Sequence, residues 1–237
     1  MIRLEIADDV GVRTTIAMSW SSGKDSAWAL DVLRRDEGVA VVGALTTITK
    51  TFGRVSMHGV REEVLDAQIE RLAIPMTKVK IPSPCSNAVY EQTMGEVVTK
   101  LKQDGVEAVA FGDLFLEDIR AYREGNMRKA GLDCLFPLWG RDTATLSREM
   151  VDSGLIAIIT CLDPKVMPRE FAGRIYDHDF LDDLPEHVDP CGEHGEFHTV
   201  VVSGPMFRAP IPVEIGETVE RDGFVFTDVS VEQQSQP

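Results

Sequence analysis

Two kinds of segment alternate regularly along the first two-thirds of the chain, and this alternation leaves few folds open. One kind is a short apolar run rich in β-branched residues, and the other has the apolar spacing of an amphipathic helix. We expect strands at Thr14–Ser19, Val39–Ile48, Met76–Ile81, Glu107–Phe111 and Leu155–Ile159, and helices at Asp25–Arg35, Arg61–Ala73, Asn87–Lys102 and Glu117–Ala130. Strands that are apolar throughout are buried on both faces. The pattern therefore predicts an α/β fold with a doubly wound, mostly parallel sheet flanked by helices.

The character of the sequence changes near Pro137, and the remainder predicts a smaller α+β domain. A helix at Thr143–Ser153 is expected to precede the strand at Leu155, and further strands are expected at Glu196–Val202, Val213–Glu220 and Phe224–Val231. The last two should form a hairpin, because the Asp222-Gly223 pair between them suits a tight two-residue turn. We expect a larger domain at 1–137, a smaller one at 138–232 and a flexible tail at 233–237.

The charge balance argues against a broad nucleic-acid-binding surface. The 237 residues include 24 lysines and arginines against 39 aspartates and glutamates, a formal net charge of −15, which repels phosphate backbones at long range. The chain has no apolar run of the roughly 20 residues needed to cross a bilayer, and residues 1–11 lack the apolar core of a secretion signal. We expect a cytoplasmic protein with reduced thiols that binds neither nucleic acid nor membrane.

The segment Ser19-Trp20-Ser21-Ser22-Gly23-Lys24-Asp25-Ser26 lies between the first expected strand and helix and has the composition of an anion-binding loop. Small residues let several backbone N–H groups converge on an anion, and the helix adds unpaired N–H groups and the positive end of its dipole. The hydroxyls of Ser21 and Ser26 can donate to phosphate oxygens, and Lys24 supplies charge. The segment is not a Walker A loop, because Met18 occupies the first glycine position and an aspartate follows the lysine. An ordinary capped turn is the alternative.

This loop resembles the S-G-G-x-D-S signature of the PP-loop ATP pyrophosphatases, whose fold is Rossmann-like, of the adenine nucleotide alpha hydrolase type. Ser22 stands where that family usually has its first glycine, and serine adopts a positive φ less readily than glycine. The resemblance implies that the ATP phosphates are bound by Ser21, Ser22, Gly23, Lys24, Asp25 and Ser26. It also implies that Asp25 assists Mg²⁺ or fixes the loop, with helix capping as the alternative role.

Two further segments narrow the resemblance to one family. The first runs from Gly112-Asp113-Leu114-Phe115 through Arg120, Tyr122, Arg123 and Asn126 to Leu135-Phe136-Pro137-Leu138-Trp139-Gly140-Arg141-Asp142. The second is Asp189-Pro190-Cys191-Gly192-Glu193-His194-Gly195-Glu196-Phe197-His198-Thr199, followed by Gly204-Pro205-Met206-Phe207. Together with the loop, these segments resemble the diphthine–ammonia ligase family and its bacterial relatives, over the stretch from about residue 15 to residue 207.

The resemblance implies an ATP-dependent amide synthesis. A substrate carboxylate attacks the α-phosphate of ATP, pyrophosphate leaves, and ammonia then displaces AMP from the acyl-adenylate. In the named members of the family the carboxylate belongs to diphthine, a modified histidine of elongation factor 2. Bacteria are not expected to contain diphthamide, so a bacterial chain would need another acceptor. The implied partners are ATP, Mg²⁺, ammonia and a carboxylate acceptor, and homo-oligomerisation is left open.

Two other functions remain open. One is another PP-loop enzyme with a different acceptor, such as a tRNA-modifying thiolase or a nucleotide pyrophosphatase. The net charge of −15 and the absence of a C-x-x-C pair count against the tRNA enzyme. The other is a non-catalytic adenine-nucleotide sensor, which only the serine at position 22 favours.

Further candidates for nucleotide contacts lie at the ends of expected strands. Gly112 and Asp113 follow the fourth strand, at the crevice edge where a nucleotide would lie in this fold, although a strand-ending turn would also explain them. Backbone groups from Ala44 to Thr46, near the end of the second strand, are candidates for adenine contacts. Arg120, Tyr122 and Arg123 could meet an anionic substrate or form a solvated helix face.

The second domain holds the remaining catalytic candidates. Glu193, Glu196 and His198 form its tightest polar group and join Lys24 and Asp25 as expected catalytic residues. On a strand, Glu196 and His198 share one face. They could hold ammonium, orient the acyl group or deprotonate the incoming amine, and a hydrogen-bonded structural anchor is the alternative. Cysteine and histidine at these spacings also suggest zinc, but a fourth ligand is missing.

Overall fold

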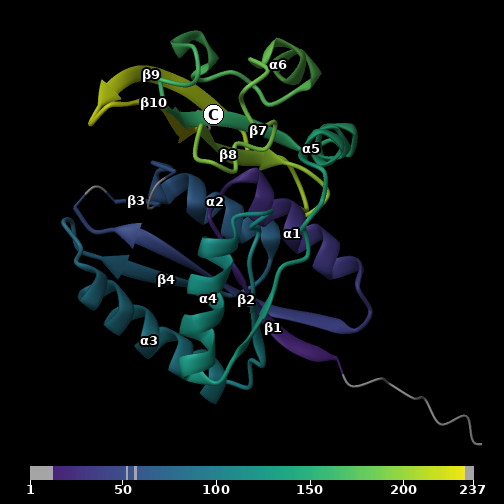
Figure 1. The fold of residues 1–237 in the computed structure, drawn as a ribbon, viewed down its shortest axis with the longest axis vertical. Helices are drawn as coiled ribbons and strands as arrows, with labels where there is room; N and C mark the ends of the chain where they lie inside the picture. Colours follow the sequence, from purple (N-terminus) through teal and green to yellow (C-terminus); the bar gives the residue numbers. More distant parts are fainter. Residues whose placement is uncertain (1–12, 52, 56–57, 233–237) are drawn as a thin grey trace, which may run out of the picture.

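The computed structural model describes residues 13–51, 53–55 and 58–232. The tail expected at 233–237 and the amino-terminal segment 1–11 lie outside the described residues. Within them the chain forms a mostly parallel sheet A and a separate antiparallel sheet B, which Figure 1 shows below and above the centre of the molecule. No helix of the described chain combines the length and the apolar character needed to span a bilayer.

Sheet A has the strand order β3-β2-β1-β5-β6, and β4 also pairs with β2. Its strands are β1 (Thr14–Ser19), β2 (Val39–Thr49), β3 (Arg54–Val55), β4 (Met76–Ile81), β5 (Ala108–Ala110) and β6 (Asp133–Leu135). Every pairing is parallel except that of the short β3 with β2. The chain winds from β1 outward through β2 and β4 and then returns to the other side of β1 with β5. This confirms the predicted doubly wound, mostly parallel sheet.

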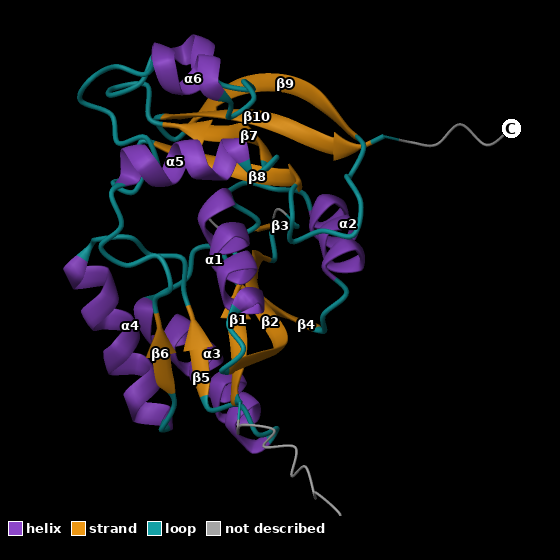
Figure 2. Ribbon diagram, turned by 90° about the vertical axis from the view of Figure 1, so that its right-hand side faces the viewer, coloured by secondary structure: helices purple, strands orange, loops and turns teal. Residues whose placement is uncertain are grey.

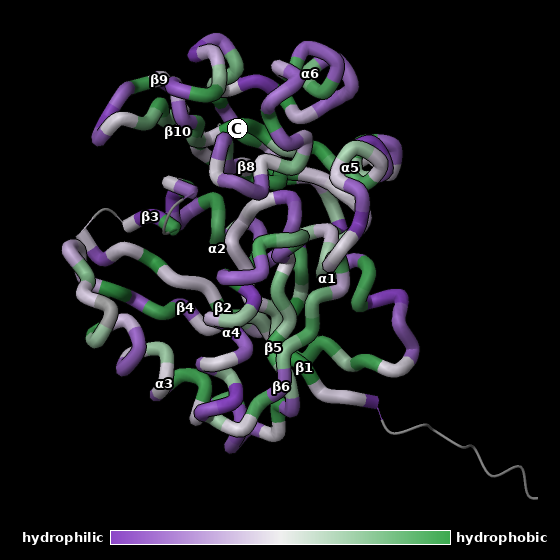
Figure 3. Tube along the Cα trace, viewed as in Figure 1, coloured by the Kyte–Doolittle hydropathy of each residue, from purple (hydrophilic) through white to green (hydrophobic). Residues whose placement is uncertain are grey.

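Helices cover both faces of sheet A. They are α1 (Lys24–Arg35), α2 (Glu62–Leu72), α3 (Asn87–Gln103) and α4 (Glu117–Ala130). In β1, Ile16 and Met18 belong to the core that contains α1 and α2, whereas Ala17 between them belongs to the core that contains residues of α3 and α4. Because successive strand residues point to opposite faces, a strand between two helical layers is apolar at every position. Figure 3 shows apolar stretches along these strands.

Sheet B has the order β8-β7-β10-β9, with antiparallel neighbours throughout. Its elements are α5 (Thr143–Asp152), β7 (Ile156–Leu162), a short 3-10 turn (Arg169–Phe171), α6 (His178–Asp183), β8 (Phe197–Ser203), β9 (Val213–Arg221) and β10 (Phe224–Val231). Asp222 and Gly223 have φ values of 53° and 81°. Two successive positive values are what a type I′ hairpin turn requires, so the predicted hairpin is confirmed.

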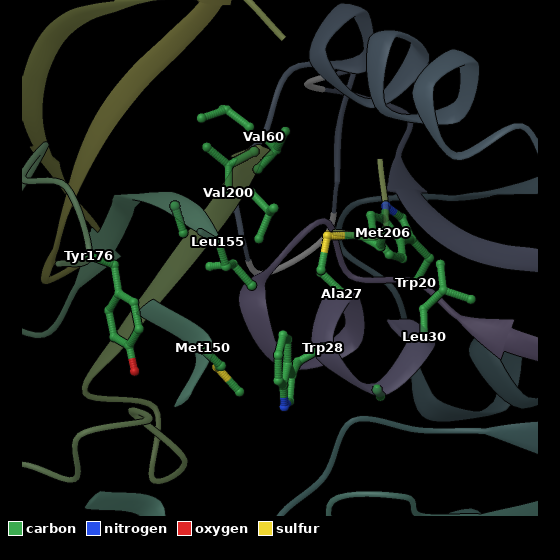
Figure 4. Close-up of a cluster of buried hydrophobic side chains, with 14 of the residues drawn as sticks. Trp20, Ala27, Trp28, Leu30, Val60, Met150, Leu155, Tyr176, Val200 and Met206 are labelled. Atoms are coloured by element: carbon green, nitrogen blue, oxygen red, sulfur yellow. The ribbon is translucent and has the colours of Figure 1, made fainter. Parts of the chain in front are cut away.

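The two sheets share one apolar core through the layer formed by α1 and α2. Figure 2 shows these helices between the sheets, and α1 contacts β8 while α2 contacts β10. The shared cluster brings Trp28 of α1 close to Met150 of α5 and Leu155, with Val200 of β8 nearby (Figure 4). As a result, the loop that leads into α1 faces sheet B, and residues distant in sequence meet around it.

Candidate active site

The predicted phosphate loop connects β1 to α1, which begins at Lys24. Ser22 in this loop has a φ of 71°, so the serine adopts the left-handed conformation that suits the glycine of the signature. Such a conformation costs a residue with a side chain about 1–2 kcal/mol. The Ser22 carbonyl accepts hydrogen bonds from the Val201 N–H at 2.9 Å and from Gln68 Nε2 at 3.1 Å. The bend at Ser22 is therefore held by hydrogen bonds from β8 and from α2.

Hydroxyl groups hold the rest of the loop together. The Oγ atoms of Ser21 and Ser26 are 3.0 Å apart, Ser26 Oγ donates to the Gly23 carbonyl at 3.0 Å, and the Gly23 N–H donates to Ser21 Oγ at 3.3 Å. Gly23 is the N-cap residue of α1 and provides no capping side chain. The first N–H of the helix, that of Lys24, donates instead to the Thr199 hydroxyl at 3.1 Å, and the amides that follow it are suited to an external anion.

A pocket of about 730 Å³ opens at the carboxyl ends of β1, β2 and β5, between sheet A and helices α3 and α4. Its walls include residues 19–21 of the loop, residues 45–47 of β2, and Phe111 just after β5. The strand order reverses at β1, and ligands of open α/β sheets bind at such a point. The Thr46 hydroxyl is buried and has no hydrogen-bond partner among the described residues. A bound ligand could satisfy it.

The expected adenine contact at Ala44 does not lie at this wall. Ala44 is inside β2, only 3% exposed, and its N–H donates to the Pro75 carbonyl at 2.8 Å. The part of the described pocket wall that β2 contributes consists of the three residues after Ala44, which are Leu45, Thr46 and Thr47. The strand ends at Thr49, one residue beyond the expected Ile48, so Ala44 lies well inside the strand rather than at its end.

Lys24 points away from the pocket, toward sheet B. Its Nζ lies 2.9 Å from an Asp25 carboxylate oxygen, also donates to the Cys191 carbonyl, and lies 5.2 Å from the Phe197 ring centre. Lys24 is 2% exposed. Burial lowers its pKa, but the attraction of Asp25 offsets this effect and leaves the pKa above its ordinary value. The charged Lys24 thus links the loop to the segment around Cys191. Lys24 is not part of the described pocket wall.

Gly112 lies directly against the start of α1. A Cβ atom at this position would come within 2.7–2.9 Å of backbone atoms of Asp25 and Ser26. Close approach of two backbones therefore explains the glycine. The adjacent Asp113 carboxylate pairs with the Arg123 guanidinium, with 3.0 Å between Oδ1 and Nη2. Arg123 lines the pocket, whereas Asp113 is engaged in this ion pair.

Glu193 joins the segment at residues 189–199 to the residues that follow β5. Its Oε1 accepts hydrogen bonds from the Leu114 N–H at 2.8 Å and the Phe115 N–H at 3.4 Å. Burial raises the pKa of Glu193 to about 7, and the negative charges of Asp25 and Asp113 contribute in the same direction. A carboxyl group that titrates near neutral pH beside the loop is suited to proton transfer.

Glu196 and His198 have separate sets of partners. Glu196 is 7% exposed, its Oε1 accepts from the Asp189 N–H at 3.2 Å, and its Oε2 has no partner among the described residues. The His198 ring lies against the His58 ring, with 4.7 Å between the ring centres. The hydrogen bond of Glu196 is that of a structural anchor for the turn at Asp189. In the described part of the chain, Glu196 and His198 thus have no shared partner.

His58 lines the pocket and contacts sheet B. Its Nδ1 lies 3.1 Å from the Thr199 carbonyl, which can only accept, so Nδ1 carries the proton. Burial lowers the pKa of His58 to about 4 and that of His198 to about 3. Both rings are therefore neutral at pH 7, and Nε2 of His58 can accept a proton or a hydrogen bond.

With this geometry established, two family models match the chain: the diphthamide synthase N-terminal domain over residues 13–134 and the diphthamide synthase C-terminal domain over residues 142–232. The chain belongs to the diphthamide synthase family. The diphthine–ammonia ligase of Homo sapiens is 26% identical over 236 residues, covering 91% of this chain and 88% of the relative. The Mus musculus enzyme is 26% identical over 243 residues, again covering 91% of this chain and 88% of the relative. The Danio rerio enzyme is 27% identical over 187 residues, covering 72% of this chain and 72% of the relative. These relatives support a ligase role.

Three residues of this diphthamide synthase family member contact the loop but were not among the sequence candidates. They are Gln68, His58, whose ring occupies the space beside Gly23, and Thr199, whose Oγ1 accepts from the Lys24 N–H at 3.1 Å. Gln68 had a signal in the sequence, because it occupies an apolar position of α2 between Leu65 and Leu72. A polar residue in the buried stripe of a helix needs hydrogen-bond partners. His58 carries no comparable signal.

Replacing Glu193 with glutamine should stabilise the protein at high pH. The pKa of Glu193 is about 7 in the folded chain against an ordinary 4.5, so the unfolded chain loses this proton first as the pH rises. The free energy of unfolding of the wild type therefore falls progressively as the pH rises from 4.5 to 7. Glutamine keeps an oxygen for the Leu114 N–H and removes the charge. We expect Glu193→Gln to raise the free energy of unfolding by about 1–2 kcal/mol at pH 8, with a smaller gain at pH 5.

Urea unfolding at the two pH values measures this difference. Glu214→Gln, at an exposed position of β9, is the matched control and should change the free energy of unfolding by less than about 0.5 kcal/mol. A Glu193→Gln variant less stable than the wild type at pH 8 would contradict the raised pKa.

Proposed function

We propose that this chain is an ATP-dependent ligase that activates a carboxylate as its acyl-adenylate and transfers the acyl group to ammonia. The observation that carries the proposal is the loop after β1, where Ser22 adopts a φ of 71° and Ser21 opens onto the 730 Å³ pocket. The bend brings the loop to the crevice of a doubly wound sheet, where its N–H groups and hydroxyls favour the phosphates of a nucleotide. The family's ligase role supports the same reaction class.

The proposed reaction has two steps. A carboxylate oxygen attacks the α-phosphorus of ATP, the bond from that phosphorus to the bridging oxygen breaks, and pyrophosphate leaves with the electron pair. Ammonia then attacks the acyl carbon, the bond to the AMP oxygen breaks, and the nitrogen gives up a proton. Glu193, whose pKa is about 7, is the candidate acceptor for that proton.

Magnesium would be held by Asp25 together with phosphate oxygens. The described residues include no group of three or more His, Cys, Asp or Glu side chains able to hold a metal ion by themselves. Mg²⁺ in nucleotide enzymes commonly has one or two carboxylate ligands and takes its others from phosphates and water, so the donor set fits. When bound, Mg²⁺ would neutralise triphosphate charge. Asp25 is 27% exposed beside the loop and is accessible to such an ion.

The acceptor is proposed from the relatives. Their name specifies diphthine, and we propose diphthine as the acceptor where the host makes it, and a different carboxylate elsewhere. The nucleotide-sensor alternative depended on Ser22 replacing a glycine. Since Ser22 adopts the glycine-like conformation, that substitution no longer favours a sensor over an enzyme.

Product analysis tests the proposal. Purified protein is incubated with Mg-ATP, ammonium and either diphthine-bearing elongation factor 2 or a panel of small carboxylic acids, and pyrophosphate, AMP, ADP and phosphate are measured. We expect pyrophosphate and AMP in equal amounts, with amide formation abolished when ammonium is omitted. ADP with phosphate would contradict attack at the α-phosphorus. Tight nucleotide binding without turnover on any acceptor would favour the sensor.

A further inference from the structure

Gln68 of α2 lies at the point where the phosphate loop, α2 and sheet B meet. It is 0% exposed. Its Oε1 accepts a hydrogen bond from the Trp20 indole at 3.0 Å, and its Nε2 donates to the Ser22 carbonyl at 3.1 Å and to the Val201 carbonyl at 2.8 Å. One buried amide thus binds two loop residues and one residue of β8.

The chemistry of the three partners allows only one orientation of this amide. An indole N–H can only donate and a backbone carbonyl can only accept. Gln68 must therefore present its oxygen to Trp20 and its NH₂ group to the two carbonyls, and rotating the amide by 180° would lose every bond. A glutamate could make the bond to Trp20 but could not donate from an ionised carboxylate.

The residue held by this amide is the strained residue of the loop. Ser22 has a φ of 71°, is fully buried, and its Oγ has no hydrogen-bond partner among the described residues. Its own side chain therefore does not stabilise the bend. A residue in such a conformation persists when the surrounding structure determines it. Here its carbonyl is held by Gln68 Nε2 and by the Val201 N–H.

We propose that Gln68 is a positioning residue, which keeps Ser22 in the left-handed conformation and so shapes the loop that receives the nucleotide phosphates. The described pocket wall does not include Gln68, so it acts through Ser22 rather than on the ligand. The part of this proposal that concerns nucleotide binding rests on the proposed function. The conformational coupling between positions 68 and 22 does not.

The test is a double-mutant cycle on the full chain. Gln68→Met and Gln68→Glu are made alone and together with Ser22→Gly, because glycine takes a positive φ without strain and needs no such clamp. The dissociation constant for Mg-ATP is measured by calorimetry, and the free energy of unfolding by urea titration. We expect Gln68→Met to weaken Mg-ATP binding about tenfold with Ser22 present, and at most about threefold in the Ser22→Gly background.

Two controls separate positioning from general packing. Leu65→Ala removes a fully buried side chain of the same helix and should destabilise the protein equally in both backgrounds. Gln68→Glu should bind Mg-ATP more tightly as the pH falls toward 5, relative to the wild type, because a protonated carboxyl can donate one hydrogen bond. Gln68→Met should not share this pH dependence.

The outcomes decide two separate questions. Equal losses for Gln68→Met in the two backgrounds, or unchanged Mg-ATP binding with Ser22 present, would overturn the positioning role. If the wild type itself binds no nucleotide, the proposed function fails, and the coupling measured by unfolding then decides the relation between Gln68 and Ser22 alone. The proposal would be overturned if the effects of Gln68→Met and Ser22→Gly were simply additive, both on the free energy of unfolding and on Mg-ATP binding.

Discussion

Gly112→Ala is expected to weaken Mg-ATP binding by at least about 100-fold and to lower the free energy of unfolding by about 1–3 kcal/mol. The added Cβ would lie 2.7 Å from the Asp25 carbonyl carbon and 2.8 Å from the Ser26 nitrogen. Both are backbone atoms at the start of α1, so no flexible side chain can move aside. Relief requires a shift of the helix start itself, which displaces the amides that would face phosphate oxygens.

Gly125→Ala is the matched control. Gly125 lies in α4, and a Cβ added there would meet no atom of the described residues within 4 Å. Alanine in a helix interior should stabilise by about 0.5–1 kcal/mol relative to glycine, with unchanged Mg-ATP binding. Calorimetry and urea unfolding measure both variants. Mg-ATP binding by Gly112→Ala within twofold of the wild type would show that the helix start does not set the affinity.

Asp25→Asn is expected to reduce pyrophosphate release by at least about 100-fold, equivalent to about 2.7 kcal/mol in the barrier. The carboxylate is the proposed Mg²⁺ ligand and the counter-ion of buried Lys24, whose Nζ lies 2.9 Å away. Asparagine keeps the volume and an oxygen for Lys24 but removes the charge. Asp25→Ala would in addition leave Lys24 without this partner, and should lose about 3–5 kcal/mol of stability.

Asp31→Asn is the matched control. It removes a negative charge from the same helix but not from the proposed Mg²⁺ site. Asp31 lies on the same helix, is 6% exposed, and pairs with Arg35. Its replacement should alter stability and leave the rate of pyrophosphate release within about twofold. Quenched-flow measurement of pyrophosphate gives the rates for both variants. A wild-type rate in the folded Asp25→Asn variant would remove Asp25 from the mechanism.

The sequence was most informative where one physical pattern ran over a whole element. The ranges expected for β1, β4, α4 and β10 coincide with those of the structure, because apolar strands and amphipathic helices of this length carry their period clearly. The very short β3 and β6 were not expected, since two or three residues show no period. The short helix α6 was missed for the same reason.

The site was harder to predict than the fold because its contacts cross the whole chain. The loop was located by its small residues between a strand and a helix, and the strain at Ser22 followed from the signature. The direction in which the Lys24 side chain points could not be predicted from the sequence. Its partner Cys191 is 167 residues away and reaches it only through the packing of sheet B. The same packing brings Thr199 to the loop, and Gln68 reaches the loop from α2.

The most direct test of the account is a crystal structure with Mg²⁺ and a non-hydrolysable ATP analogue. We predict phosphate oxygens within about 3.2 Å of the first amides of α1 and of the Ser21 or Ser26 hydroxyl, with the adenine ring against residues 45–47. An analogue bound elsewhere, for instance in the open groove between Trp28 of α1 and Arg148 of α5, with the phosphate loop free, would contradict it.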